Sequence, residues 1–244
     1  MIPLKDNIPV RRFPVITAGL IVLNILVYAV DRLTGTLHPS LVEVGPGMFQ
    51  QTANFVGGIS ANWSMVPAAV AHGEPNAYWT LFTTMFLHAN WLHIGGNMLF
   101  LWIFGSNVED TLGRPKFMAF YLACGLLGSL CHVASDPASM VPTVGASGAI
   151  AGLMGAYLIL FPKAEIMTIV PIIIFGAVMD VPAVVVILFS AVVEFVNAKL
   201  LGGSMMHNGG VAYFAHLGGF LSGMLLIILM GGRKLAESKL RYVG

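Results

Sequence analysis

Charged residues are scarce in this chain: 9% of its 244 residues are Asp, Glu, Lys or Arg, whereas 57% are hydrophobic. So few charges cannot form a water-facing surface on a protein of this length, and the mean hydropathy of +0.84 agrees. The formal net charge is +1 and no basic patch is visible, which argues against a nucleic-acid partner. The composition therefore predicts an integral membrane protein.

Cysteine and metal-binding motifs are also nearly absent. Cys124 and Cys131 lie seven residues apart in one predicted helix. That spacing separates them by roughly 10 Å of helical rise and excludes a disulfide between them. None of the seven histidines lies in an H-E-x-x-H motif, which excludes that class of zinc protease. We expect no metal and no cofactor.

Long apolar segments are what the chain has in abundance, and six of them are predicted to cross a bilayer core about 30 Å thick. They lie at residues 13–30, 91–108, 115–134, 146–161, 181–198 and 210–230. The first lacks a small-residue cleavage site, which favours an uncleaved span over a signal peptide. A further apolar stretch, residues 166–179, is separated from the fifth span by prolines, so we expect an interfacial or partly inserted lead-in.

The connection over residues 31–78 is rich in Gly, Pro and Asn, yet it carries Phe49, Phe55 and Trp63. Aromatic side chains favour the membrane interface, so we expect a long membrane-associated loop between helices 1 and 2. The predicted fold class is all-α, a polytopic membrane protein with a bundle of six transmembrane helices.

The distribution of positive charge predicts the orientation of the bundle. Six spans place both termini on one side, and with the N-terminus inside, ten of the twelve Lys and Arg residues are cytoplasmic. Only Arg32 and Lys199 then lie outside. We therefore expect a cytoplasmic segment at residues 1–12, a membrane domain at 13–230 and a basic cytoplasmic tail at 231–244.

Polar residues recur near the outer ends of the spans that run inward, the second, fourth and sixth. They are His93 and Asn97, then Ser147, then His216. Asn97 and His216 lie about six residues into their spans, roughly 9 Å below the outer boundary. Polar groups at that depth usually face a bundle interior or a water-filled cavity. We expect the four side chains to converge.

Ser147 lies in the uncharged segment VGASGAIAGLMG, residues 144–155, where small residues follow helical spacing. A serine in such a helix is more often a packing residue than a nucleophile, and glycines alone predict only a tight bundle. Combined with His216 as base, however, Ser147 can serve as a nucleophile. Asn97 and His93 can then donate hydrogen bonds to an oxyanion.

The chain carries no visible third catalytic member. No Asp or Glu lies in the outer halves of the second, fourth or sixth spans, so a Ser-His dyad is predicted rather than a Ser-His-Asp triad. Asp180 and Glu194, in or near the fifth span, are expected to be structural acids.

Three segments resemble the signatures of rhomboid intramembrane serine proteases. They are HANWLHIGGN at 88–97, GASGAIAGLMG at 145–155 and AHLGGFLSG at 215–223. VEDTLGR at 108–114 is similar to the family's loop after the second span. The resemblance implies a rhomboid-like six-helix bundle in which the Ser147–His216 dyad ends a water-accessible cavity.

The resemblance also implies roles for residues around the dyad. His93 and Asn97, together with backbone N–H at Ser147, are expected to stabilise the oxyanion. His88, Gly145 and Gly148 are further candidates for contacts with the cavity or substrate.

Two residues depart from the family pattern. Thr80 follows Trp79 where the family often has an arginine that anchors the loop, and Ala151 stands where many members place an aromatic against the histidine. The sequence therefore does not account for how that loop is anchored or how His216 is oriented.

The predicted function is proteolysis of peptide bonds in or near transmembrane helices, with transmembrane proteins and the lipid bilayer as partners. The expected location is a bacterial inner membrane. A rhomboid-like protein that binds transmembrane helices without cutting them is the main alternative. A transporter or channel is disfavoured because paired discontinuous helices and a charged pathway are not evident.

Overall fold

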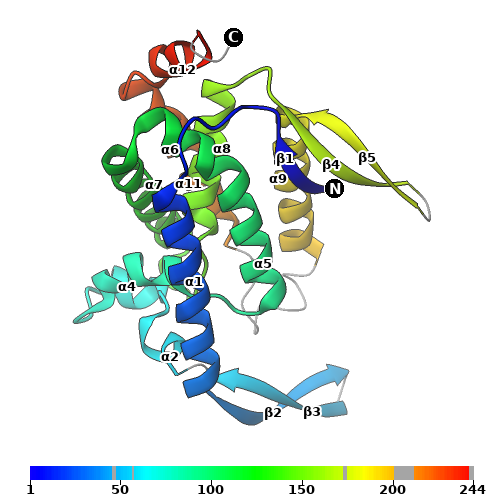
Figure 1. Ribbon diagram of the computed structural model, residues 1–244. Coiled ribbons are helices and arrows are strands. Elements are labelled where there is room, and N and C mark those ends of the chain that lie inside the picture. The colour runs from blue at the N-terminus through cyan, green and yellow to red at the C-terminus, as the bar shows by residue number, and fades with distance from the viewer. Residues whose placement is uncertain (46–47, 57, 173–174, 201–211, 242–244) are drawn as a thin grey trace.

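The structure is a computed structural model and describes residues 1–45, 48–56, 58–172, 175–200 and 212–241. Most of these residues are helical (Figure 1). The longer helices are α1 Val15–Thr34, α5 Trp91–Phe100, α7 Arg114–Ser135, α8 Ser147–Leu160, α9 Ala183–Leu200, α11 Tyr213–Leu229 and α12 Gly232–Arg241. After α5 the chain continues through a π-helical turn, η2 Leu101–Gly105, into α6 Ser106–Leu112.

Every range that the sequence predicted as a span therefore contains helix, but the helices differ in length. Among the described residues, α1 and α7 are each long and apolar enough to cross a membrane. The α11–α12 pair passes the same test only as one span, although the two helices are bent by 74° from each other. The predicted sixth span begins in residues outside the described part of the chain.

Two β-sheets correct the expectation of an all-α protein. The first pairs β1 Ile2–Asp6 with β4 Glu165–Ile172, which in turn pairs with β5 Phe175–Pro182. The predicted lead-in to the fifth span is thus a β-hairpin. Ile, Val and Thr dominate β4, and β-branched residues favour strands. Hydropathy alone does not distinguish such an apolar strand from a helix or an interfacial segment.

The second sheet occupies part of the connection between α1 and α5, where a long loop was predicted. It is an antiparallel hairpin of β2 Thr36–Gly45 and β3 Met48–Val56. The rest of the connection holds short helices: α2 Ser60–Trp63, α3 Pro67–Ala71, α4 Ala77–Thr83 and the 3₁₀ turn η1 Thr84–Phe86. The described part of this connection is therefore structured rather than irregular.

Helix α8 is the centre of the bundle. It packs most extensively against α11 and α7, and its residues from Gly148 to Leu153 are buried. Apolar side chains on α1, α9 and α11 remain exposed, including Leu26, Leu188 and Leu225. Such an exposed apolar surface suits lipid rather than water.

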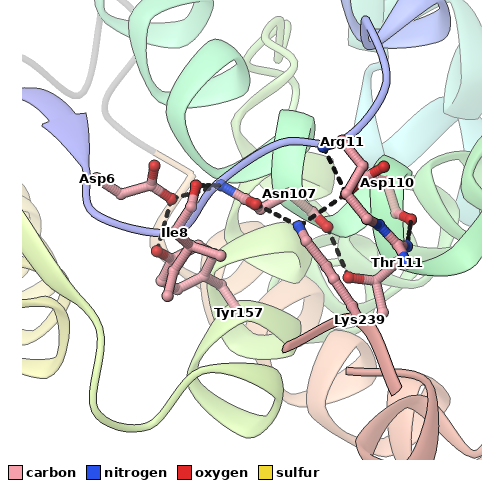
Figure 2. A network of polar contacts seen from close by, with 8 residues as sticks. All are labelled: Asp6, Ile8, Arg11, Asn107, Asp110, Thr111, Tyr157 and Lys239. Atoms are coloured by element: carbon pink, nitrogen blue, oxygen red, sulfur yellow. Dashed lines mark hydrogen bonds and ion pairs between the residues drawn. The ribbon is translucent and has the colours of Figure 1, made fainter. Parts of the chain in front are cut away.

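The end of α8 opposite Ser147 is tied to the N-terminal segment (Figure 2). The Tyr157 hydroxyl donates to Asp6 Oδ2 at 2.7 Å, and Asn107 Nδ2 donates to the same oxygen at 2.6 Å. Burial raises the pKa of the Asp6 carboxyl, and these two hydrogen bonds oppose the shift. The bonds join β1, α6 and α8.

The same network continues to the C-terminal helix (Figure 2). Lys239 of α12 is fully buried and lies 3.0 Å from Asp110 Oδ2, and its ammonium donates to Asn107 Oδ1 at 2.6 Å. Arg11 approaches the same Asp110 oxygen, with 3.3 Å between Nε and Oδ2. The segments near both termini therefore meet on α6. We call the set Asp6, Arg11, Asn107, Asp110, Tyr157 and Lys239 the inner network.

Candidate active site

Ser147 is the first residue of α8, and its hydroxyl lies against the imidazole of His216 on α11. Ser147 Oγ and His216 Nε2 are 2.5 Å apart although the residues are 69 positions apart in sequence. The segment before Ser147 is held by the Gly145 N–H, which donates to the Thr84 carbonyl at 2.9 Å. The structure thus brings together the serine and histidine that the sequence singled out.

Small residues allow α8 and α11 to come this close. A Cβ atom added at Gly219 would overlap the Gly148 carbonyl oxygen, and one added at Gly223 would overlap the Gly152 carbonyl oxygen. The backbones of α8 and α11 therefore touch at both of these glycine contacts. This close approach gives the helix separation that the hydrogen bond between Ser147 and His216 requires.

A cavity of about 210 Å³ opens beside this pair. His93 and Asn97 line it together with Ser147 and His216, so all four predicted polar residues share one space. The remaining lining residues are Leu92, Gly96, Phe100, Ile150, Ala151 and Met154. Within the described part of the chain no Asp or Glu lines this cavity.

Asn97 brings a side-chain amide donor to the cavity. Its side chain is largely buried, and among the described residues its Nδ2 has no hydrogen-bond partner. A buried amide without a partner costs free energy, and such a group in a cavity is available to a bound molecule. This geometry suits a donor that acts on substrate.

His93 is positioned by the start of its own helix. Asn90 caps α5, and its Oδ1 accepts from the His93 N–H at 2.9 Å. The Ala89 N–H donates to His93 Nδ1 at 3.4 Å. The other ring nitrogen, Nε2, lies beside the Gly145 Cα, since a Cβ added there would be 2.9 Å from it and 3.4 Å from Ser147 Oγ.

The three remaining predicted contacts lie in different places. Gly145 adjoins both His93 and Ser147, and its φ of +136° is a conformation that glycine adopts most readily. Gly148 faces α11 instead, where an added Cβ would be 3.4 Å from the Ala215 carbonyl oxygen. His88 is 2% exposed, with its ring 5.1 Å from that of His93, and it is not among the cavity-lining residues.

The two departures from the rhomboid pattern have visible consequences. The Thr80 hydroxyl donates to the Ala77 carbonyl at 2.6 Å, a hydrogen bond that stays within α4. Ala151 lines the cavity, where its small side chain leaves space beside His216. Asp180 is exposed on β5, and the side chain of Glu194 lies outside the described part of the chain.

Three residues that hold the site or the helices around it in place were not predicted from the sequence. The role of Asn90 could have been predicted, because Asn immediately before a helix is a favoured N-cap. The role of Glu109 could not, since its carboxylate accepts from Ile16 N and Thr17 N, at 3.0 and 2.7 Å, and so caps α1 from a distant part of the chain. Arg32 likewise acts across a long sequence separation.

Comparison with known proteins identifies a family domain in this chain. Residues 75–233 match the Rhomboid domain. The chain is 33% identical over 150 residues to Rhomboid protein 1, mitochondrial, of Saccharomyces cerevisiae, which covers 60% of this chain and 40% of that protein. It is 31% identical over 167 residues to the putative rhomboid protease YdcA of Bacillus subtilis, with 68% of this chain and 72% of that protein covered.

A third relative is matched over a shorter region. The chain is 40% identical over 89 residues to rhomboid protease GluP of Bacillus subtilis, which covers 36% of this chain and 16% of GluP. The chain therefore spans less than half the length of the yeast protein and of GluP. Because the domain match covers more than half of the chain and includes Ser147, His216, His93 and Asn97, this membrane-integral protein belongs to the Rhomboid family.

Proposed function

We propose that this protein is an intramembrane serine protease that hydrolyses peptide bonds in or near transmembrane helices. The observation that carries the proposal is the 2.5 Å contact between Ser147 Oγ and His216 Nε2 beside a cavity. The contact joins a nucleophile to a base, and the cavity leaves room for a substrate carbonyl.

The chemistry uses two residues as a dyad. His216 Nε2 accepts the proton of the Ser147 hydroxyl while Oγ attacks the carbonyl carbon of the scissile bond. His216 then gives that proton to the leaving amine, and the acyl-enzyme is hydrolysed by water that His216 activates in the same way. With no acid lining the cavity among the described residues, a dyad accounts for the site.

The oxyanion formed in each step needs donors at the same end of α8. Asn97 Nδ2, His93 Nε2 and the backbone N–H of Ser147 are the groups we propose for it. In a site of low dielectric such preorganised donors stabilise the transition state strongly. The Asn97 donor has no acceptor among the residues that the structure describes, and His93 lies beside Gly145; both observations support this role.

The bundle is proposed to contain six spans, with both termini in the cytoplasm of a bacterial inner membrane. The contacts of Arg11 and Lys239 with one carboxylate support a shared side for the two ends. Helix α8 has 14 residues and is therefore about 21 Å long, shorter than a bilayer core of about 30 Å. This length supports a position of Ser147 below the outer boundary. Reporter fusions after Gly73 and at the C-terminus should report opposite sides, and the same side for both would contradict the arrangement.

The proposed substrate is a transmembrane helix that unwinds locally. One turn of a helix with its side chains, about 10 Å wide and 5.4 Å long, fills roughly 400 Å³, which is more than the cavity of about 210 Å³ holds. An intact helix therefore does not fit. Its backbone groups are also bonded internally, so the scissile carbonyl must be released before attack. Replacing helix-destabilising residues near the cut with Leu should slow cleavage, and unchanged rates would contradict the unwinding requirement.

The test of function is cleavage of a model transmembrane substrate by purified protein. Ser147→Ala should abolish turnover and labelling by a serine-reactive probe while leaving thermal stability nearly unchanged. Ser222→Ala is the matched control, because the hydroxyl of this serine on α11 donates to the Gly219 carbonyl of its own helix at 2.8 Å and Ser222 lies outside the cavity. Turnover by Ser147→Ala would refute the proposal. Binding without cleavage by the wild type would favour the non-cleaving alternative.

A further inference from the structure

Arg32, at the outer end of α1, reaches across to the segment that precedes α5. Its Nη2 donates to the His88 carbonyl at 3.2 Å and also to the Ala89 carbonyl. These contacts span 56 and 57 positions in sequence. They place a guanidinium at the base of the helix that carries His93 and Asn97.

The side chain of Arg32 is itself held in position. Its guanidinium carbon lies 4.9 Å from the centre of the Tyr28 ring, and the Tyr28 ring packs against Trp91, the first residue of α5, at 4.9 Å. A cation over an aromatic face is attracted by the ring. Neighbouring Asp31 is buried and accepts from the Ser60 N–H at 2.7 Å, which fixes the end of α1 against α2.

A single peptide group connects Arg32 to His93. The carbonyl that receives the Arg32 hydrogen bond at 3.2 Å belongs to the peptide between His88 and Ala89. The N–H of the same peptide donates to His93 Nδ1 at 3.4 Å. A charged donor on a carbonyl polarises the peptide and strengthens its N–H as a donor, because linked hydrogen bonds reinforce one another.

The consequence concerns the tautomer of His93. When Nδ1 accepts a hydrogen bond, the proton of a neutral imidazole resides on Nε2. That nitrogen is the one beside Gly145 and close to Ser147. The chain of bonds from Arg32 therefore favours the tautomer that presents an N–H to the cavity.

We propose that Arg32 is a positioning residue for the reaction: through the His88–Ala89 peptide it holds His93 as the Nε2–H tautomer, ready to donate to the oxyanion. The proposal rests on the proposed protease function. It differs from a purely structural role, in which Arg32 would only stabilise the junction between α1 and α5 and would act equally on every property of the site.

A double-mutant cycle separates these roles. Arg32→Met should lower kcat by roughly 10-fold with KM nearly unchanged, less than the roughly 10²-fold loss expected for a missing oxyanion donor. In a His93→Ala background the same substitution should have almost no further effect, whereas in an Asn97→Ala background it should again cost roughly 10-fold. Arg12→Met, an exposed arginine at the other end of the bundle, is the matched control and should leave kcat unchanged.

Rescue and spectroscopy complete the test. Arg32→Lys should lose less activity than Arg32→Met, because its ammonium keeps the charge; some loss should remain, because it lacks the planar fork of a guanidinium. If Arg32→Met does not fold, Arg32→Lys takes its place in the cycle. Nitrogen-15 shifts of the His93 ring should show the proton on Nε2 in the wild type and a mixture of tautomers in Arg32→Met. An equal kcat loss in all three backgrounds, or an unchanged tautomer, would overturn the proposal. A wild-type protein that shows this tautomer but cleaves nothing would refute the protease function instead.

Discussion

The two ends of α8 use hydrogen bonds in opposite ways. At the Tyr157 end, the hydroxyl, carboxylate, amide and cationic groups of the inner network bond to one another (Figure 2). These bonds join the N-terminal segment, α6, α8 and α12. At the other end, Ser147 is hydrogen-bonded to His216 beside a cavity, and the Asn97 amide that lines this cavity has a donor with no partner among the described residues. The polar groups at the Tyr157 end are hydrogen-bonded to one another, whereas the Ser147 end keeps donors available to a bound molecule.

This difference indicates where stability and activity reside. A satisfied buried network holds its helices in one arrangement, and removing a member leaves an uncompensated group. An unsatisfied donor weakens the fold slightly but can stabilise a transition state that supplies the missing acceptor. Substitutions at the Ser147 end should therefore change kcat, and substitutions in the inner network should change the free energy of unfolding.

The largest effect is expected at the Ser147 end. Asn97→Ala should lower kcat by roughly 10² to 10³-fold, about 2.7 to 4 kcal/mol, because a preorganised oxyanion donor is lost. Its thermal stability should remain near that of the wild type. Asn24→Ala is the control, since Asn24 is a buried amide on α1 that donates to the Leu20 carbonyl at 2.7 Å. Near-normal kcat in Asn97→Ala would remove this residue from the mechanism.

Lys239→Met tests the inner network. Lys239 and Asp110 are 0% and 2% exposed, so the substitution leaves Asp110 buried with Arg11 as its remaining cation. We expect the free energy of unfolding to fall by about 3 kcal/mol, the low end for a broken buried pair, with kcat per folded molecule unchanged. Chemical denaturation and active-site titration measure the two quantities. Lys234→Met, exposed on the same helix, should be neutral; a large kcat loss in Lys239→Met would show that the two ends are coupled.

Gly219→Ala addresses the helix contact between the two ends. The added methyl group would overlap the Gly148 carbonyl oxygen, so α8 and α11 must separate and lengthen the Ser147–His216 contact. A misplacement of about 1 Å can cost about 10²-fold in rate, and we expect a kcat loss of that order. Gly19→Ala on α1, where an added Cβ meets nothing within 4 Å, is the control. Comparable activity in the two variants would show that close backbone contact is not required.

The smallest expected effect is the pH dependence contributed by Asp6. Burial raises its pKa above the ordinary 3.8, so the folded state binds this proton more readily than the unfolded state. Asp6 therefore favours folding below its ordinary pKa, and this contribution is lost as the pH rises through the raised value. Lowering the pH from 7 toward the ordinary pKa of 3.8 should raise the melting temperature of the wild type relative to that of Asp6→Asn. Parallel pH profiles for the two proteins would contradict this assignment.

Much of the candidate site was predictable from the sequence. Hydropathy located the ranges in which the long helices lie, because apolar segments of that length have few alternatives to a helix in lipid. Counting residues from the outer end of each span predicted a similar membrane depth for His93, Asn97, Ser147 and His216. In the structure all four line the cavity. The glycines on the two helix faces indicated close packing, since small residues permit backbones to touch.

The sequence alone was a poorer guide where segments are paired across long separations. The β1–β4–β5 sheet was missed because strand pairing depends on partners that are distant in the chain. Asp110 was visible in VEDTLGR, but its contacts with Arg11 and Lys239 could not be inferred from that segment. Local pattern determined which residues are polar, apolar or small, whereas only tertiary structure decided which donors find acceptors inside the protein and which remain available to a substrate. The physical reason is that a hydrogen bond requires its donor and acceptor to be positioned to within a few tenths of an ångström. The groups concerned lie far apart in the sequence, so only the folded chain sets that position.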